Sequence, residues 1–196
     1  MLAERMNTFS GSPTSALIAK VAELRAEGKD IISLNVGEPD FGTPDYIKCG
    51  AIKAIVDNFS KYTAGNGIIE LRRLISKKLH EDNNLEYTTD EICATVGAKQ
   101  AIFNSIMALV DPGDEVLLPV PCWVSYTEMI KFAGAKPVFV DVEAETFDLD
   151  IEALEKAVTT KTKAIVICTP NNPTGAVYSE GTLRKLEQDF NCKWLF

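Results

Sequence analysis

The sequence predicts an α/β protein of three layers, α/β/α, in which helices cover both faces of a mostly parallel sheet. Short β-branched runs alternate with segments whose apolar residues recur at helical spacing. Strands that alternate with helices in this way form predominantly parallel sheets. With 196 residues and a hydrophobic content of 46%, the chain can bury a core of one domain or slightly more.

The first half of the chain is predicted to contain three helices and two strands. Gly28 is a good C-terminal cap for the first helix, and Thr43 before Pro44 is expected to cap the second. The β-branched runs predict strands over 31–35 and 92–96. The helices are predicted over 15–27 with Leu17, Val21 and Leu24 at helical spacing, 44–59 with Ile47, Ala51, Ile55 and Phe59 facing inward, and about 71–80 with Leu71, Leu74, Ile75 and Leu79.

The alternation of strands and helices becomes regular in the second half. Asp150 and Ser179 are expected to cap the last two helices, and Gly134 is expected to end the helix before them. The predicted strands are 115–118, 137–140 and 164–168, and the predicted helices are 97–110, 123–132, 151–158 and 179–190, the last with Leu183, Leu186 and Phe190 inward.

The segment Thr169 to Tyr178 reads T-P-N-N-P-T-G-A-V-Y and follows a buried run, so it is predicted to be a rigid loop at the end of a strand. Its two prolines fix φ on either side of the paired asparagines. The bond between Asn172 and Pro173 is a candidate for the cis form. Such a loop can hold one amide side chain above the end of a sheet. A strand-to-helix connection without further function is the alternative reading.

Charge and composition exclude several classes of partner. The formal net charge is -8, and no basic cluster exceeds the pairs Arg72-Arg73 and Lys77-Lys78, which are interpreted as a solvated helix face. We therefore expect neither nucleic acid nor an anionic membrane as a partner. No apolar run approaches the ~20 residues needed to span a bilayer, and the N-terminus does not resemble a signal peptide. The expected location is the cytoplasm.

The five cysteines form no C-x-x-C pair, and His80 is the only histidine. This spacing argues against a zinc site, and the odd number of cysteines suggests reduced thiols. We expect no metal. With a single histidine on a polar helix, a Ser-His-Asp or Cys-His catalyst is disfavoured, and His80 is interpreted as a surface residue.

In open α/β sheets, ligands bind beyond the carboxyl ends of the strands. Three segments are expected there: Gly97-Ala98-Lys99, Pro121-Cys122-Trp123 and Pro170 to Gly175. The Gly97-Ala98-Lys99 segment enters a helix and can hold a phosphate. Trp123 offers a flat apolar face, although a single tryptophan is often a core residue. Asn172 offers an amide to a polar ring substituent. Together these groups describe a site for pyridoxal 5'-phosphate.

Five motifs occur in order along the chain: Leu34 to Phe41, Tyr62 to Gly67 followed by Glu70-Leu71-Arg72, Val96 to Ala101, Pro121 to Tyr126, and Asn171 to Gly175. Over about residues 12–187 they resemble the class I and II pyridoxal-phosphate-dependent aminotransferases, in particular the bacterial-type aspartate aminotransferase branch. The resemblance implies the aspartate aminotransferase fold, known as fold type I. It also implies transfer of an amino group between an amino acid and a 2-oxo acid, with the cofactor as electron sink.

The resemblance also assigns roles to the cofactor-binding residues. It implies that Ala98 and Lys99, with the backbone after Gly97, bind the cofactor phosphate, and that Trp123 stacks on its ring. It implies that Asn172 hydrogen-bonds the phenolic oxygen of the cofactor.

Substrate contacts and a subunit contact are implied in the same way. Asn172 and the backbone N–H of Gly37 match groups that meet the substrate carboxylate. Lys99 matches a position that can meet the distal acid of a dicarboxylate, or it is simply a solvated lysine near the phosphate. Tyr62 matches a tyrosine that reaches the partner's cofactor phosphate in a homodimer.

The resemblance divides the chain into residues 1–45, an N-terminal arm and small-domain segment, and residues 46–196, an incomplete cofactor-binding domain. The branch often has a basic residue and a threonine where this chain has Ser12 and Ala16, which weakens a claim to aspartate/prephenate dual specificity. No lysine matches the residue that forms the Schiff base, and the aspartate and arginine motifs of the family are not found. The fold is therefore expected to be truncated.

Without the matching lysine, this polypeptide alone is expected to be inactive. A non-catalytic remnant that pairs with an intact homologue is the alternative function. A related reaction on the same fold, such as that of a carbon-sulfur lyase, also stays open, because most residues that decide the reaction type are not matched.

Overall fold

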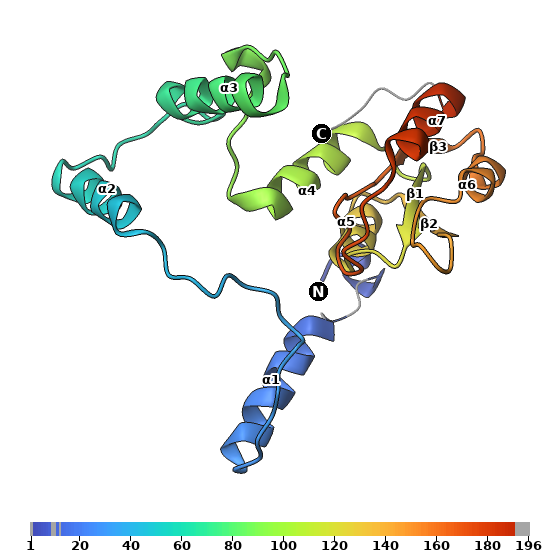
Figure 1. Ribbon diagram of the computed structural model, residues 1–196, viewed down its shortest axis with the longest axis horizontal. Coiled ribbons are helices and arrows are strands. Elements are labelled where there is room, and N and C mark those ends of the chain that lie inside the picture. Colours follow the sequence, from blue (N-terminus) through green and yellow to red (C-terminus); the bar gives the residue numbers. More distant parts are fainter. Residues whose placement is uncertain (1, 9–10, 12, 191–196) are drawn as a thin grey trace. The chain divides into compact units, whose positions relative to one another are not determined.

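The structure is a computed structural model that describes residues 2–8, 11 and 13–190. It divides into two compact units: residues 11–96 form one, and residues 1–10 with the chain from Gly97 onward form the other. We call them the helical unit and the sheet unit. Figure 1 labels the helices and strands of both. The predicted boundary at residue 45 concerns the domains of the whole protein and stays a prediction.

The sheet unit is built on three parallel strands: β1 Glu115–Val120, β2 Lys136–Asp141 and β3 Thr162–Ile165. Their order is β2-β1-β3, so β1 is paired on both sides. Four α-helices and a short 3-10 helix complete the unit: α4 Gly97–Leu109, α5 Ser125–Phe132, α6 Ile151–Ala157, α7 Glu180–Phe190 and η1 Glu4–Thr8. These elements confirm the three predicted strands and four predicted helices of the second half, with shifted ends.

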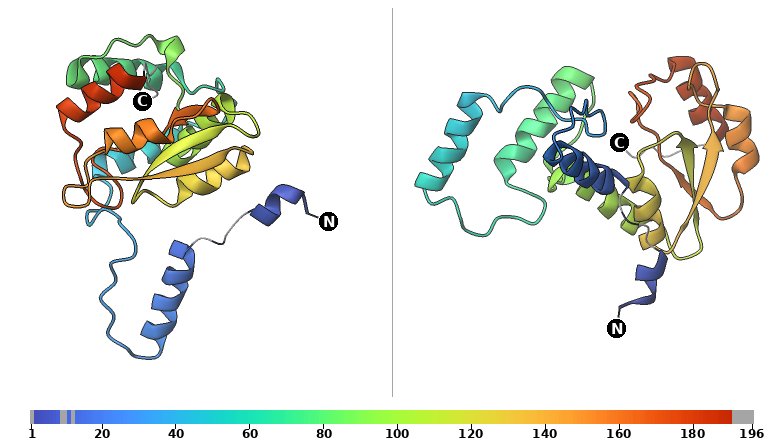
Figure 2. Two further views of the ribbon diagram at one scale, coloured as in Figure 1. Left: turned by 90° about the vertical axis from the view of Figure 1, so that its right-hand side faces the viewer. Right: turned by 90° about the horizontal axis from the view of Figure 1, so that it is seen from below.

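Side chains of β1 alternate between two apolar clusters, one on each face of the sheet. Val116 and Leu118 pack in a cluster with Ile106 of α4 and Ile130 of α5. Leu117 packs on the other face, in the cluster with Leu154 and Leu186 of α6 and α7. Figures 1 and 2 show α5 on one side of the strands and α6 and α7 on the other. The predicted three-layer α/β/α architecture is therefore confirmed.

Glu115 is a buried carboxylate at the start of the central strand, with a relative exposure of 8%. It accepts a hydrogen bond of 2.7 Å from the Thr159 hydroxyl and one of 3.0 Å from Lys136 Nζ of β2. Its backbone N–H donates to Lys161 O at 2.8 Å. The Thr159 hydroxyl and then Lys136 lower the pKa of Glu115 below its usual value. Glu115 thus ties β1 to β2 and to the segment that leads into β3.

The predicted capping residues of the sheet unit are confirmed. Asp150 Oδ1 accepts a hydrogen bond of 2.9 Å from the Ala153 N–H at the start of α6. Ser179 Oγ accepts one of 3.0 Å from the Thr182 N–H at the start of α7. Gly134 ends α5 with a positive φ of 81°. Each of these signals is local, because the partner lies within four residues of the cap.

The helical unit contains α1 Pro13–Ala26, α2 Asp45–Val56, α3 Ile69–Asn83 and the 3-10 helix η2 Thr89–Glu91. Gly28 has a positive φ and follows α1, as predicted. The prediction that Thr43 caps α2 is wrong: Pro44 occupies the cap position, without a side-chain hydrogen bond. No helix among the described residues is long and apolar enough to cross a membrane.

The two strands predicted in the first half do not form. Residues 31–35 and 92–96 are irregular, and the apolar Leu34 and Val96 are each 92% exposed. A strand needs a second strand for its ladder of backbone hydrogen bonds, and among the described residues neither segment is paired with one, although the Ala94 N–H donates to Asn66 O at 3.0 Å. The β-branched sequence alone therefore did not decide the secondary structure.

The predicted inward face of the second helix is also wrong. Ile55 and Phe59 are 77% and 63% exposed, Ile47 and Ala51 are exposed as well, and α2 contains no buried residue. Apolar spacing creates a face that can pack, but burial requires a second surface against it. Within the helical unit, no such surface covers this helix.

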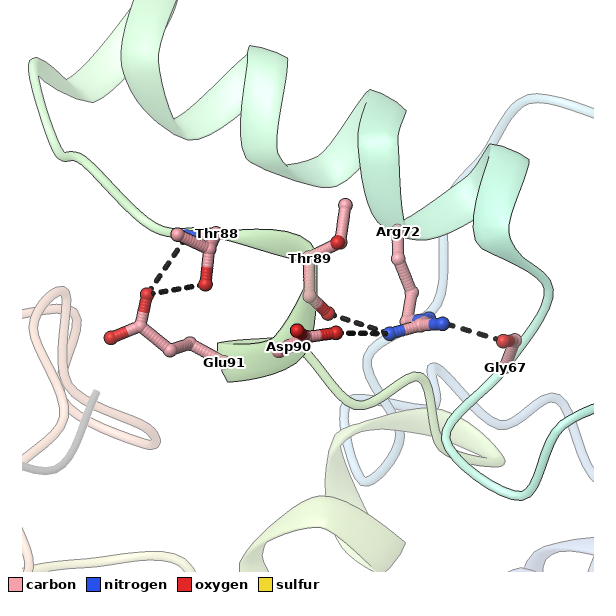
Figure 3. Close-up of polar contacts among 6 residues, drawn as sticks. All are labelled: Gly67, Arg72, Thr88, Thr89, Asp90 and Glu91. Carbon is pink, nitrogen blue, oxygen red and sulfur yellow. Dashed lines mark hydrogen bonds and ion pairs between the residues drawn. The ribbon is translucent and has the colours of Figure 1, made fainter.

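Arg72 on α3 is 7% exposed, so the interpretation of the pair Arg72-Arg73 as a solvated face is wrong for its first member. Its guanidinium donates to Gly67 O at 3.2 Å and to Thr89 O at 2.7 Å, and lies 3.8 Å from the Asp90 carboxylate (Figure 3). Arg72 thus joins the loop before α3 to the segment after it. The other members of the two basic pairs, Arg73, Lys77 and Lys78, are exposed, as is His80.

Glu115→Gln is expected to lower the free energy of unfolding near neutral pH. The folded-state pKa of Glu115 is lowered, so its carboxylate stabilises the fold above the reference value of 4.5, and this contribution is lost as the pH falls through the folded-state pKa. The deficit of the variant should therefore shrink below about pH 4.5. Urea unfolding at several pH values measures it. Glu145→Gln, which removes an exposed carboxylate, is the control, and an equal pH response in both variants would contradict the assignment.

Gly67→Ala is expected to destabilise the helical unit by about 1–3 kcal/mol. Gly67 has a φ of 98°, and a Cβ placed there would lie 2.8 Å from the Cβ of Ala94. Gly65→Ala is the matched control, because no atom lies within 4 Å of the added carbon. Urea unfolding followed by circular dichroism measures both changes. Equal stability of the two variants would show that the contact with Ala94 is absent in solution.

Candidate functional site

The loop after β3 and the loop after β1 are joined by the side chain of Asn171. Asn171 is 8% exposed, and its Nδ2 donates to Pro121 O at 3.0 Å and to Thr174 Oγ1 at 2.8 Å. Its backbone N–H donates to Ala176 O, and its carbonyl accepts from the Gly175 N–H, both at 2.8 Å. The loop is therefore closed on itself and anchored to the neighbouring loop.

Asn172 follows this anchor and is exposed. The peptide bond between Asn172 and Pro173 is cis, as predicted, and the bonds before Pro121 and Pro170 are cis as well. The loop expected from the sequence at this place is confirmed. Its amide side chain at Asn172 is available to a ligand beside the end of the sheet.

Trp123 and Lys99 are brought together at the same end of the sheet unit. Lys99 Nζ lies 5.0 Å from the centre of the Trp123 ring, within the range of a cation–π contact. Trp123 is partly buried against the core cluster of α4 and α5 and makes an edge-to-face contact with Tyr126, with ring centres 5.3 Å apart. The indole is therefore supported by packing, and a cation lies over its ring.

Gly97, Ala98 and Lys99 form the first turn of α4. Gly97 has a φ of 80°, which favours glycine where the chain turns into the helix. The N-terminal turn of a helix carries partial positive charge and favours anions. Combined with the ammonium group of Lys99, this turn has the donor chemistry that a phosphate requires.

Two buried tyrosines lie with two cysteines in the interior of the sheet unit. Burial raises the pKa of Tyr126 to about 12, with a further contribution from Cys168, to which the phenol is hydrogen-bonded. Burial also raises the pKa of Tyr178 and that of the Cys122 thiol. Tyr126, Tyr178 and the Cys122 thiol are therefore uncharged near neutral pH.

Two of the sequence-predicted site residues, Gly37 and Tyr62, belong to the helical unit. Tyr62 is fully exposed, and Gly37 has open space around the position of a Cβ. The loop that contains Tyr62 ends at Gly67, where Arg72 holds it (Figure 3). The sheet unit carries the other five on its own elements: Gly97, Ala98 and Lys99 lie on one turn, Lys99 lies over Trp123, and Asn172 lies on the loop that Asn171 joins to Pro121.

Sequence reasoning missed Asn171 and Arg72. Both are polar residues whose burial depends on carbonyl groups far along the chain: Pro121 O lies 50 residues from Asn171, and Thr89 O lies 17 residues from Arg72. No feature of the sequence near Asn171 indicated the carbonyl groups that it contacts.

The residues present fit a phosphate-bearing aromatic cofactor. They supply a helix N-terminus and an ammonium group for the phosphate, an indole face for a ring, and an exposed amide for a polar ring substituent. These are the three groups that the sequence predicted for pyridoxal 5'-phosphate.

The family model of the class I and II aminotransferases matches residues 29–194. Among curated proteins, a probable aspartate/prephenate aminotransferase of Aquifex aeolicus is 48% identical over 188 residues, which are 95% of this chain and 48% of that protein. The aspartate/prephenate aminotransferase of Nitrosomonas europaea is 46% identical over 186 residues, which are 94% of this chain and 47% of that protein.

Solved structures of the same family superpose closely. Aspartate aminotransferase from Thermus thermophilus with maleate gives a TM-score of 0.91 at 44% identity, covering 96% of this chain and 50% of that chain. An alanine aminotransferase from Pyrococcus furiosus gives 0.90 at 33% identity, covering 97% and 50%. The chain therefore spans about half the length of the relatives it matches.

The family match over most of the chain agrees with the fold and with the donor groups that the sheet unit gathers. Members of this family depend on pyridoxal phosphate. This chain belongs to the class I and II aminotransferases.

Proposed function

We propose that this chain supplies part of the cofactor-binding half of an enzyme that transfers an amino group between an amino acid, aspartate or a related acid, and a 2-oxo acid. The observation that carries the proposal is the position of Lys99 Nζ, 5.0 Å from the centre of the Trp123 ring and on the first turn of α4. This arrangement suits a planar ring that carries a phosphate. The family relationship supports pyridoxal 5'-phosphate as that group.

In this proposal, each residue binds or orients the cofactor. Lys99 and Ala98, with the backbone after Gly97, bind the phosphate at the helix terminus. Trp123 packs against one face of the ring, and Asn172 donates to the ring oxygen. When bound, the cofactor supplies an electron sink for reaction at the amino-bearing carbon. The contribution of these residues is to hold the ring in one plane and one orientation.

Substrate binding is assigned to Asn172 and Gly37, which would meet the substrate carboxylate, and to Lys99, which would also meet a second acid group. A dicarboxylic substrate is supported by the relatives, which include an aspartate/prephenate aminotransferase and an aspartate aminotransferase with maleate. Ser12 and Ala16 stand where the branch often has a basic residue and a threonine. Their side chains are neutral and small, so we favour aspartate over prephenate.

The proposal extends to the organisation of the whole protein. Residues 1–45 would belong to an arm and small-domain segment, and residues 46–196 to the large cofactor-binding domain. A homodimer would place Tyr62 at the partner's cofactor phosphate; its full exposure is compatible with that role. A cytoplasmic location is supported by the free thiols of Cys49, Cys93, Cys122 and Cys168.

A non-catalytic partner of an intact homologue is the second candidate function. The apolar residues of α2 support it, because Ile52, Ile55 and Val56 are 59%, 77% and 71% exposed and could pack against another subunit. Mixing the chain with an intact relative and measuring mass by light scattering distinguishes the two functions. A stable mixed dimer in which the added chain contributes no aminotransferase activity would favour the role of a non-catalytic partner.

A polypeptide of these 196 residues is expected to bind the cofactor weakly and to show no turnover of aspartate with 2-oxoglutarate. None of its lysines matches the family's Schiff-base lysine, so the acid–base group of the reaction is not supplied. A coupled assay for oxaloacetate measures the rate, with an intact aminotransferase as the positive control. Cofactor-dependent turnover by the purified polypeptide would contradict this expectation.

Lys99→Ala is expected to weaken binding of pyridoxal 5'-phosphate by about tenfold to a hundredfold, because one hydrogen bond to a charged group contributes about 1.5–3 kcal/mol. Equilibrium dialysis measures the affinity. Lys156→Ala, which removes an exposed lysine of α6 in the same unit, should bind like the unaltered chain. The affinity for pyridoxal, which lacks the phosphate, should be the same for the Lys99 variant and the unaltered chain. An equal loss for both ligands would assign Lys99 to the ring and not to the phosphate.

A further inference from the structure

Asn171 is the buried polar residue closest in sequence to the proposed ligand groups. Its side chain has two acceptors for the Nδ2 group: Pro121 O on the loop after β1 and Thr174 Oγ1 within its own loop. A primary amide can donate two hydrogen bonds from one nitrogen, and both directions are used here. Both N–H donors of the side chain are therefore committed to the protein and are not available to a ligand.

The positions of these partners connect the two loops that carry the ligand-binding groups. Pro121 lies two residues before Trp123, and Asn171 lies directly before Asn172. The bond from Asn171 Nδ2 to Pro121 O, at 3.0 Å, consequently fixes how far the loop of Trp123 stands from the loop of Asn172. β1 and β3 are paired neighbours, but their pairing ends at Leu117 and Ile165, before either loop begins.

Thr174 holds the Asn171 amide in the orientation that this bond requires. Its hydroxyl accepts from Asn171 Nδ2 at 2.8 Å and from the Ala176 N–H at 3.2 Å. The backbone of Asn171 is held in turn by Ala176 O and the Gly175 N–H. One contact thus orients the side-chain amide of Asn171, and two contacts hold its backbone.

We propose that Asn171 is a positioning residue that sets the spacing between the face of Trp123 and the amide of Asn172, and thereby the fit of the cofactor ring between them. This inference rests on the proposed function. Removing the Asn171 amide takes away no atom that touches the ligand, yet it releases the two loops from each other. Cofactor affinity should fall for that reason alone.

The first experiment compares Asn171→Ala with Asn104→Ala, which removes an exposed asparagine of α4. Both are made with Trp194→Phe, so that Trp123 is the only tryptophan and its fluorescence reports binding of pyridoxal 5'-phosphate. Asn171→Ala should weaken affinity about tenfold, and Asn104→Ala should leave it unchanged. An affinity within twofold of the unaltered protein for Asn171→Ala would overturn the inference.

The second experiment uses Asn171→Asp to separate positioning from a general loss of stability. As a carboxylate, this side chain cannot donate to Pro121 O; as a neutral acid it can donate one hydrogen bond. Because an aspartate carboxyl usually ionises near pH 4, the affinity of the variant, divided by that of the unaltered protein at the same pH, should rise between about pH 6 and pH 3.5. A ratio that stays constant over this range would contradict a role through the bond to Pro121.

A readout without cofactor distinguishes failure of this inference from failure of the proposed function. In Asn171→Ala, hydrogen exchange of the backbone N–H groups at positions 171 and 175 should become about tenfold faster. Exchange of the backbone N–H of Leu118 in β1 should change less than twofold. If exchange responds in this way but the unaltered protein binds no cofactor, the loop anchor stands and the cofactor assignment fails. If exchange at both amides is unchanged, the anchor itself is refuted.

Discussion

The parallel pairing of β1 with a strand on each side is the interaction on which the sheet unit depends. Val116, Leu117 and Leu118 are each at most 1% exposed, and they alternate between the two apolar clusters. Full burial of each such side chain contributes about 1.5–3 kcal/mol. Because β1 contributes side chains to the clusters on both faces of the sheet, the helices of both outer layers pack against the same strand. The loop after β1 consequently starts from a fixed point.

The proposed site takes its rigidity from this strand and from polar contacts beyond its end. Burial of β1 fixes the start of the loop that carries Trp123, whereas Asn171 fixes the neighbouring loop relative to it. The groups proposed to contact the ligand, Lys99 and Asn172, remain exposed. A buried support with exposed donors allows binding without a large rearrangement of the backbone. Tyr126 and Tyr178 contribute to packing, one in each of the two apolar clusters.

The helical unit obeys different constraints, because its helices carry apolar residues that its own elements do not cover. Its most specific contact is polar: Arg72 joins Gly67 O and Thr89 O across α3. Two hydrogen bonds to backbone carbonyls fix the end of the Tyr62 loop without a large apolar core.

The sequence by itself determined the features whose physical cause is local. The helices α4 to α7, the caps at Asp150 and Ser179, and the cis bond before Pro173 each depend on residues a few positions apart, and the sequence predicted them. The tertiary structure decided the rest. Residues 92–96 have strand composition but no strand beside them, and Arg72 and Asn171 are buried because carbonyl groups 17 and 50 residues away accept their hydrogen bonds. Composition and spacing carry no information about such partners, since only folding brings them within reach.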